Sequence, residues 1–299
     1  MSPSIFDDAG QEARHVAGLW WFMFTVATAV YVLVAAMVII GVVRRRRQAE
    51  PAEGDRTSFV WWGGIVMPVV ILGVLAYLTV STTTALGRDG PTGLRVDVTG
   101  HDWWWEVRYP DSGRTTANEI HLPVGRTVDL RLRSDDVIHS FWVPQLAGKL
   151  DVLPDQTNHL RIKAERTGTF LGECAEFCGI QHANMRFVVV VQTAGDYARW
   201  AATGRSAPTS SRGAAIFQRE SCAGCHTIAG TEATGTYGPD LTDFGSRRWL
   251  GAKAVRNTPE QLLRWLRDPE SIKPGVLMPP SLLPESELQA LVAYLESLR

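Results

Sequence analysis

The most specific chemical pattern in the chain is a pair of cysteines followed by a histidine. Cys222 and Cys225 lie three residues apart, and His226 comes directly after them. This spacing is typical of covalent c-type haem attachment, because each thiol can add to one haem vinyl group while the histidine binds the iron. A redox-active pair or half of a zinc site shares the Cys-x-x-Cys spacing. A redox pair, however, usually begins a helix after a strand, whereas here a helical pattern at 214–220 precedes Cys222.

Met278 is the predicted second axial ligand of the haem iron. Of the six methionines, only Met185 and Met278 lie outside the initiator position and the apolar segments near the N-terminus. Met278 belongs to a proline-rich stretch, 273–280, which favours an extended loop. His/Met ligation raises the haem potential and leaves no free position on the iron, so such a site suits electron transfer rather than catalysis.

The other two cysteines share one short segment with two further soft ligands. Cys174, Cys178, His182 and Met185 follow one another closely. Thiolates and thioethers select copper, and a methionine beside a Cys/His cluster has no role in a zinc site. A second histidine must come from elsewhere in the chain, and His139 is the best placed. A plain disulfide and a Cys2His2 zinc site with His139 and His182 are the alternatives.

Two long apolar runs near the N-terminus are predicted to anchor these sites to a membrane. Residues 16–43 and 59–80 are each long enough to cross a bilayer as a helix, and both have tryptophans near one end. The connection between them begins with four arginines, 44–47, which predicts that it is cytoplasmic. The N-terminus and everything after residue 80 are then extracytoplasmic. The acidic N-terminal tail lacks the basic region of a signal peptide, so we expect the first run to be an anchor.

The segment after the second run has the pattern of β-strands. Apolar Val128, Leu130 and Leu132 alternate with charged residues, and Leu160 and Ile162 do the same. Turn residues recur at strand-length intervals, which favours a sandwich or barrel. We therefore expect an N-terminal tail with two transmembrane helices over 1–90 and a β domain over 91–195.

A linker and a small α domain are predicted to complete the chain. Residues 196–211 include a stretch that is poor in large apolar side chains and read as a linker. Thr258 before Pro259 is a good helix start. Apolar residues recur at helical spacing near the C-terminus, at Leu288, Leu291, Val292 and Leu295. Residues 212–299 resemble class I cytochromes c, a resemblance that includes Gly238-Pro239-Asp240-Leu241 and implies that the Pro239 carbonyl supports the His226 ring.

Residues 15–192 closely resemble subunit II of haem–copper cytochrome c oxidases. The resemblance rests on the two apolar runs, on Gly100-His101-Asp102-Trp103-Trp104-Trp105, on the His139 segment and on the Cys-x3-Cys-x3-His-x2-Met loop. The C-terminal haem domain extends it to the subset of such subunits with a fused cytochrome c. It implies a cupredoxin β-barrel that holds a binuclear CuA centre.

The family's copper ligands map onto positions that are intact in this sequence. The resemblance implies that Cys174 and Cys178 bridge two copper ions and that His139 and His182 each bind one of them. It also implies that Met185 is a weak axial ligand and that Glu176 contributes its backbone carbonyl, while the Glu176 carboxylate reaches a magnesium ion at the interface with subunit I. The remaining histidines outside the haem motif, His15, His101, His121 and His159, receive no ligand role.

The three consecutive tryptophans, 103–105, are assigned roles partly by resemblance and partly by the strand pattern. By resemblance, Trp103 is the point at which electrons arrive from cytochrome c. On a strand, Trp103 and Trp105 would share one face and Trp104 would take the other, so at least one of them should fill the core.

These observations predict the electron-input subunit of a respiratory terminal oxidase in a bacterial-type plasma membrane. Electrons would pass from a cytochrome c donor through the haem c and CuA to subunit I, where oxygen is reduced with coupled proton translocation. Subunit I, subunit III and the lipid bilayer are the expected partners, and no catalytic acid, base or nucleophile is predicted in this chain. A net charge of −1 implies no nucleic-acid partner. The linker would keep the haem at high effective concentration near CuA.

Three other functions share parts of this pattern. A quinol oxidase subunit II would have the same fold but would lack the copper ligands. A haem–copper nitric oxide reductase could use an equivalent subunit with a different terminal acceptor. A disulfide-closed assembly module would bind no copper at residues 94–191 and would leave only the haem active.

Overall fold

The computed structural model describes residues 4, 6–47, 57–86, 93–202 and 211–299. The chain divides into two compact units, one of residues 14–90 and one that joins residues 1–13 to residues 91–299. Each unit is described by itself below.

The unit of residues 14–90 consists of apolar helices. Helix α1 covers Gln11–Arg47, and a second run of helix comprises α2 (Thr57–Trp61), the π-helical turn η1 (Trp62–Val66) and α3 (Met67–Leu86). Both runs are long and apolar enough to cross a membrane, and their large apolar side chains are exposed. The predicted spans, 16–43 and 59–80, lie inside these helices.

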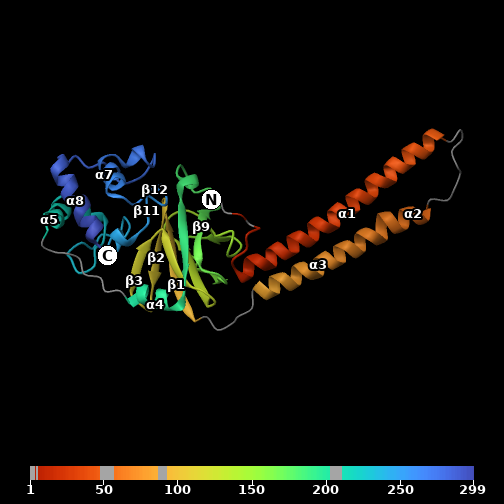
Figure 1. Ribbon diagram of the computed structural model, residues 1–299, viewed down its shortest axis with the longest axis horizontal. Helices are drawn as coiled ribbons and strands as arrows, with labels where there is room; N and C mark the ends of the chain where they lie inside the picture. Colours follow the sequence, from red (N-terminus) through yellow and green to blue (C-terminus); the bar gives the residue numbers. More distant parts are fainter. Residues whose placement is uncertain (1–3, 5, 48–56, 87–92, 203–210) are drawn as a thin grey trace. The chain divides into compact units, whose positions relative to one another are not determined.

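Two five-stranded sheets form the β domain (Figure 1). All paired strands are antiparallel except β1 with β5 and β4 with β10, which are parallel. The first sheet has the order β3 (Arg114–Ala117), β2 (Trp104–Tyr109), β1 (Leu94–His101), β5 (Thr127–Ser134) and β8 (Asn158–Lys163). The second has the order β4 (Glu119–Pro123), β10 (Arg186–Gln192), β9 (Gly168–Cys174), β6 (His139–Trp142) and β7 (Leu150–Val152).

The alternation predicted from the sequence generates the core between these sheets. Val128, Leu130 and Leu132 on β5 are fully buried, while the residues between them are only partly buried. Trp105 is also fully buried, and its ring packs edge-on against Phe141 of the second sheet with centroids 5.6 Å apart. One hydrophobic cluster thus joins both sheets and fixes the strand ends that carry the site.

The predicted linker, 196–211, differs from the structure over its first residues. Residues 196–202 belong to helix α4 (Ala194–Ala202), in which Tyr197 is buried and packs against Trp200 with ring centroids 5.8 Å apart. Alanine and glycine dominate this part of the sequence, so a helix that packs through Tyr197 and Trp200 was not predicted. Residues 203–210 of the predicted linker lie outside the described part of the chain.

The C-terminal domain is helical, as predicted. Its elements are α5 (Arg212–Arg219), α6 (Cys222–Cys225), η3 (Phe244–Ser246), the small ladder of β11 (Trp249–Leu250) and β12 (Val255–Arg256), α7 (Pro259–Arg267), η4 (Pro269–Ser271) and α8 (Glu285–Ser297). Helices α5 and α8 pack closely at Gly213, where an added Cβ would lie only 2.3 Å from the Ala290 carbonyl oxygen. The predicted helix start is confirmed: the Thr258 side chain accepts a hydrogen bond from the Gln261 amide.

Replacing this capping residue provides a test of the C-terminal domain. Thr258→Ala removes the acceptor of an otherwise unpaired helix N–H, and we expect it to cost about 1 kcal/mol of stability. The measurement is thermal unfolding of the purified protein, followed through the haem absorption. Thr258→Ser keeps the hydroxyl and should retain most of the stability; equal losses in both variants would contradict a capping role.

Candidate metal and haem centres

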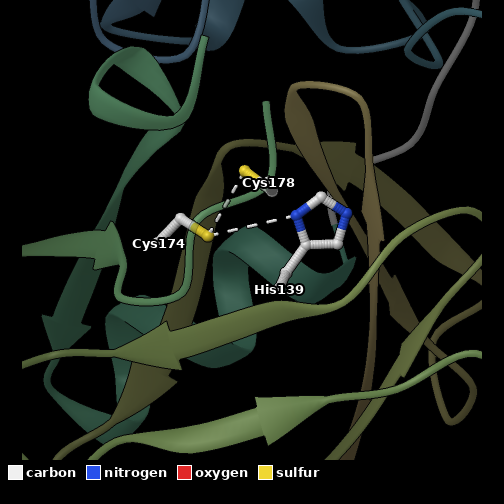
Figure 2. Close-up of side chains that lie close together, drawn as sticks. All are labelled: His139, Cys174 and Cys178. Carbon is white, nitrogen blue, oxygen red and sulfur yellow. Dashed lines mark hydrogen bonds between the residues drawn. The ribbon is translucent and has the colours of Figure 1, made fainter. Parts of the chain in front are cut away.

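Neighbouring strands of the second sheet bring His139 and Cys174 together. His139 begins β6 and Cys174 ends β9, and the two strands pair with Phe141 opposite Cys174. Figure 2 shows the imidazole facing the sulfur, with Nδ1 of His139 3.9 Å from Sγ of Cys174. Both side chains are buried, so the sheet register itself sets this contact.

The loop between β9 and β10 supplies the remaining soft donors. The Cys174 and Cys178 sulfurs lie 3.7 Å apart (Figure 2). The Cys178 sulfur is 3.7 Å from Nδ1 of His182 and 3.8 Å from Sδ of Met185, and the Cys174 sulfur is 3.3 Å from the Glu176 carbonyl oxygen. The structure therefore collects two thiols, two imidazoles, a thioether and a carbonyl at the positions that the sequence singled out.

This donor set suits a copper centre better than the alternatives. The two sulfurs are well beyond the ~2.0 Å length of a disulfide bond, and both cysteines are free. A zinc site would leave the buried Met185 sulfur beside the cluster without a purpose. The residues that are present fit a soft metal shared between the thiols.

A carboxylate orients the His139 ring. Nε2 of His139 lies 2.8 Å from Oδ1 of Asp136, which leaves Nδ1 directed at Cys174. Asp136 is itself fixed, because its side chain accepts hydrogen bonds from the amides of Asp102 and Val137, each at 2.6 Å. A carboxylate behind a ligating histidine sets the tautomer and strengthens the ligand. This role of Asp136 was not predicted from the sequence, although an acid three residues before a candidate ligand is a local pattern.

The donors of the β-domain site set each other's protonation states. The Cys178 thiol donates to Cys174, which lowers the pKa of Cys174 and raises that of Cys178. Burial by itself would lower the pKa of His139, but its contacts with Asp136 and Cys174 outweigh burial and raise the pKa to about 9. A metal must therefore displace protons from His139 and Cys178 when it binds.

Trp103 lies against the loop, but not as the strand pattern predicted. Strand β2 begins at Trp104, and Trp103 precedes it in a turn, so Trp103 and Trp105 do not share a strand face. Its indole Nε1–H donates to the Cys178 carbonyl at 2.7 Å. Gly179, at φ +110°, lies under the indole, where a Cβ would be 3.1 Å from the ring. Trp105 fills the core, as expected for at least one of the three.

The haem-attachment segment holds its histidine in a defined orientation. Cys222 and Cys225 begin and end α6, and His226 leaves the helix in an extended conformation. Nδ1 of His226 lies 2.7 Å from the Pro239 carbonyl oxygen, which leaves Nε2 available for iron. Burial lowers the pKa of His226 and so favours the neutral, ligating form. The free thiols and the oriented imidazole fit a covalently attached haem.

Met278 lies at the edge of the hydrophobic core of this domain. The indole Nε1–H of Trp265 donates to its Sδ at 3.1 Å, and both side chains contact the same apolar cluster. Helix α7 thus positions the loop that carries Met278. The contact of Trp265 with Met278 was not predicted from the sequence, since spacing does not reveal where an indole N–H points.

Two family models match the chain. The model of the cytochrome c oxidase subunit II periplasmic domain covers residues 114–193, and the cytochrome c model covers residues 210–299. Cytochrome c oxidase subunit 2 of Alkalihalophilus pseudofirmus is 34% identical over 98% of this chain and 90% of its own length. The subunit 2 of Bacillus sp. strain PS3 is 34% identical over 85% of this chain and 80% of its own length. The periplasmic domain of subunit II of cytochrome oxidase from Bradyrhizobium japonicum aligns with a TM-score of 0.37 and 30% identity, over 38% of this chain and 93% of that one.

The fold and the two donor sets define a class: electron-transfer proteins with a cupredoxin-like β domain, a cytochrome c domain and apolar N-terminal helices. The chain belongs to the cytochrome c oxidase subunit 2 family, whose member from A. pseudofirmus it matches over almost its whole length. It is therefore a subunit of an oxidoreductase, and the family and fold class expected from the sequence are confirmed.

Copper uptake by the metal-free protein should depend on pH. Because His139 and Cys178 hold protons that the metal displaces, we expect binding to tighten by roughly tenfold per released proton for each pH unit, up to the His139 pKa of about 9. The measurement is competition with a chelator at a series of pH values. Asp136→Asn removes the carboxylate that raises the His139 pKa, so copper binding should release about one proton fewer and its affinity should depend less steeply on pH. Asp135→Asn is the matched control, since Asp135 pairs with Arg133 instead. An affinity that did not vary with pH would contradict the protonation states.

Gly238 provides a test of the haem side. An added Cβ would lie 2.5 Å from Cε1 of His226, so Gly238→Ala should push the ring off the Pro239 carbonyl. We expect a weakened iron–histidine bond, visible as a shift toward high-spin haem absorption. Gly224→Ala is the control, because nothing lies within 4 Å of the added methyl. A low-spin spectrum in both variants would show that the predicted orientation of His226 is wrong.

Proposed function

We propose that this chain is the electron-input subunit of a respiratory cytochrome c oxidase. Its own haem c would receive electrons from a cytochrome c donor and pass them to a binuclear CuA centre, and from there to subunit I, where oxygen is reduced and protons are translocated. The observation that carries the proposal is the convergence of the copper-donor positions on the two adjacent, buried sulfurs of Cys174 and Cys178.

The ligands proposed for copper are His139, Cys174, the Glu176 carbonyl, Cys178, His182 and Met185. A copper pair held by these residues would share one unpaired electron between its two ions, so the geometry of the site would change little on reduction. The protein supplies the matching rigidity. Strands β9 and β10 close the loop with Glu173 paired to Arg186, and the Met185 carbonyl accepts the Cys174 amide at 3.1 Å.

The ligands proposed for the haem are Cys222 and Cys225 for covalent attachment, with His226 and Met278 on the iron. Pro239 holds Nδ1 of His226 and Trp265 holds Sδ of Met278, so both axial groups are positioned by hydrogen bonds. With His226 and Met278 both bound to the iron, no position would be left for oxygen, which supports a relay rather than a catalytic role.

The proposed topology has both domains outside a bacterial-type plasma membrane. The arginine-rich connection, 44–47, would be cytoplasmic, and the two helical runs would cross the bilayer. The segment before α1 supports this orientation. The Ala9 amide donates to the Gln145 carbonyl at 2.7 Å and Gly10 bridges to Ala164, so the N-terminal segment and the β domain belong on the same side.

Subunits I and III are the proposed partners in the membrane. The Glu176 carbonyl faces the Cys174 sulfur while its side chain is exposed, which supports a role for the carboxylate at a magnesium ion shared with subunit I. The neighbouring Phe177 is 77% exposed, an unusual surface position for a phenyl ring and a suitable contact for another subunit.

The proposal is tested on the purified complex. We expect a mixed-valence copper signal in electron paramagnetic resonance that Cys174→Ser abolishes, together with the loss of oxygen consumption with reduced cytochrome c. The control is Ser112→Ala, a hydroxyl in the turn between β2 and β3, which should change neither. A sample that binds zinc, or no metal, would refute the copper centre. Consumption of nitric oxide instead of oxygen would assign the other terminal acceptor.

A further inference from the structure

A lysine of the C-terminal domain reaches the residue beside the copper loop. Within the unit that contains residues 91–299, the Lys273 ammonium donates to the Trp103 backbone carbonyl at 2.6 Å. Lys273 is only 4% exposed, and burial lowers its pKa to about 8. Burying a lysine side chain costs free energy unless its ammonium group has a hydrogen-bond partner, and here the Trp103 carbonyl is that partner.

The contact is part of a short connection between the two proposed redox sites. Lys273 begins the proline-rich loop that leads to Met278, the proposed iron ligand. On the other side, Trp103 donates its indole N–H to the Cys178 carbonyl at 2.7 Å. Two hydrogen bonds therefore link the loop of an iron ligand to the backbone of a copper ligand.

The loop that begins at Lys273 also makes an apolar contact with the segment that carries the proposed copper ligands. Gly275, two residues after Lys273, has φ +83°, and an added Cβ would lie 3.0 Å from Cγ2 of Ile180. Ile180 follows Cys178 by two residues on the copper loop. Lys273 thus enters this interface where backbone and apolar contacts already hold the two loops together.

A second buried charged contact anchors the domains elsewhere. Asp243 accepts from Arg114 of strand β3 at 3.3 Å and from Arg247 of its own domain at 2.7 Å. Arg114 also donates to the Trp200 carbonyl at 2.7 Å, and its guanidinium lies over the Trp200 ring. All three charged side chains are buried, and removing one partner from such a cluster leaves a buried charge without compensation.

We propose that Lys273 is a positioning residue for electron transfer, which docks the haem-ligand loop on Trp103 and places a positive charge beside the CuA centre. The inference rests on the proposed function. The transfer moves one electron, so that the haem iron is oxidised and the copper pair is reduced, and it requires no proton. Lys273 takes no part in that exchange. It fixes the distance over which the electron moves, and its charge favours the reduced copper pair.

The test uses the purified oxidase complex with Lys273→Met, which keeps the length of the side chain but removes its charge and donors. We expect electron transfer from haem to copper, followed optically after rapid injection of an electron into the haem, to slow on the order of tenfold. The copper midpoint potential should fall. Lys273→Arg keeps a cation and donors and should restore the potential and most of the rate. Lys149→Met, at an exposed lysine of the β domain, is the matched control and should behave as the native protein.

Asp243→Asn separates docking from charge. It should also slow transfer by weakening the anchor, but it should leave the copper potential unchanged, because Asp243 does not contact Trp103. A native rate and potential in Lys273→Met would overturn the inference. So would a slow Lys273→Met that Lys273→Arg does not rescue, since a cation with donors at this position would then not be what the transfer requires. Failure of the proposed function is distinguishable, because the native complex would then lack the mixed-valence copper signal itself.

Discussion

The structure depends on holding two thiols within 4 Å of each other without letting them bond. Cys174 ends a strand and Cys178 lies four residues later, with the sulfurs 3.7 Å apart. The loop can keep this spacing because the β9–β10 ladder closes it, and because the Ser140 carbonyl accepts the Ala175 amide at 2.9 Å. The two-sheet core has one consequence for function: it makes the ends of β6 and β9 rigid enough to bring an imidazole to the same point.

Backbone carbonyls do much of the positioning around both sites. The Pro239 carbonyl orients His226, the Cys178 carbonyl holds the Trp103 indole, and the Trp103 carbonyl receives Lys273. A carbonyl on a packed segment moves less than a side chain, because it has no rotamers of its own. The positions of the proposed ligands and their neighbours are therefore determined by the backbone. A site held in this way should change little in geometry on electron transfer.

The sequence predicted those parts of the site whose signal is local. The strand alternation at Val128–Leu132, the Thr258 cap and the four soft donors between Cys174 and Met185 can all be read from short spacings. Two contacts that position the sites were not predicted. Asp136 behind His139 required knowing which ring nitrogen faces the sulfur. The contact of Lys273 with Trp103 joins positions 170 residues apart and leaves no pattern along the chain.

Buried charged contacts hold the C-terminal domain against the β domain, which a flexible linker alone would not do. A linker alone predicts a tethered haem that samples many positions, with an advantage that comes from effective concentration. Arg114, Asp243 and Lys273 are instead desolvated between the β domain and the cytochrome domain. Burying ions adds little net stability, because desolvation offsets much of the attraction, but such contacts are strongly directional. A domain that needed only proximity would gain nothing from them. Electron transfer, which requires a fixed and short separation, gains a defined pose, and the same contacts that cost desolvation provide it.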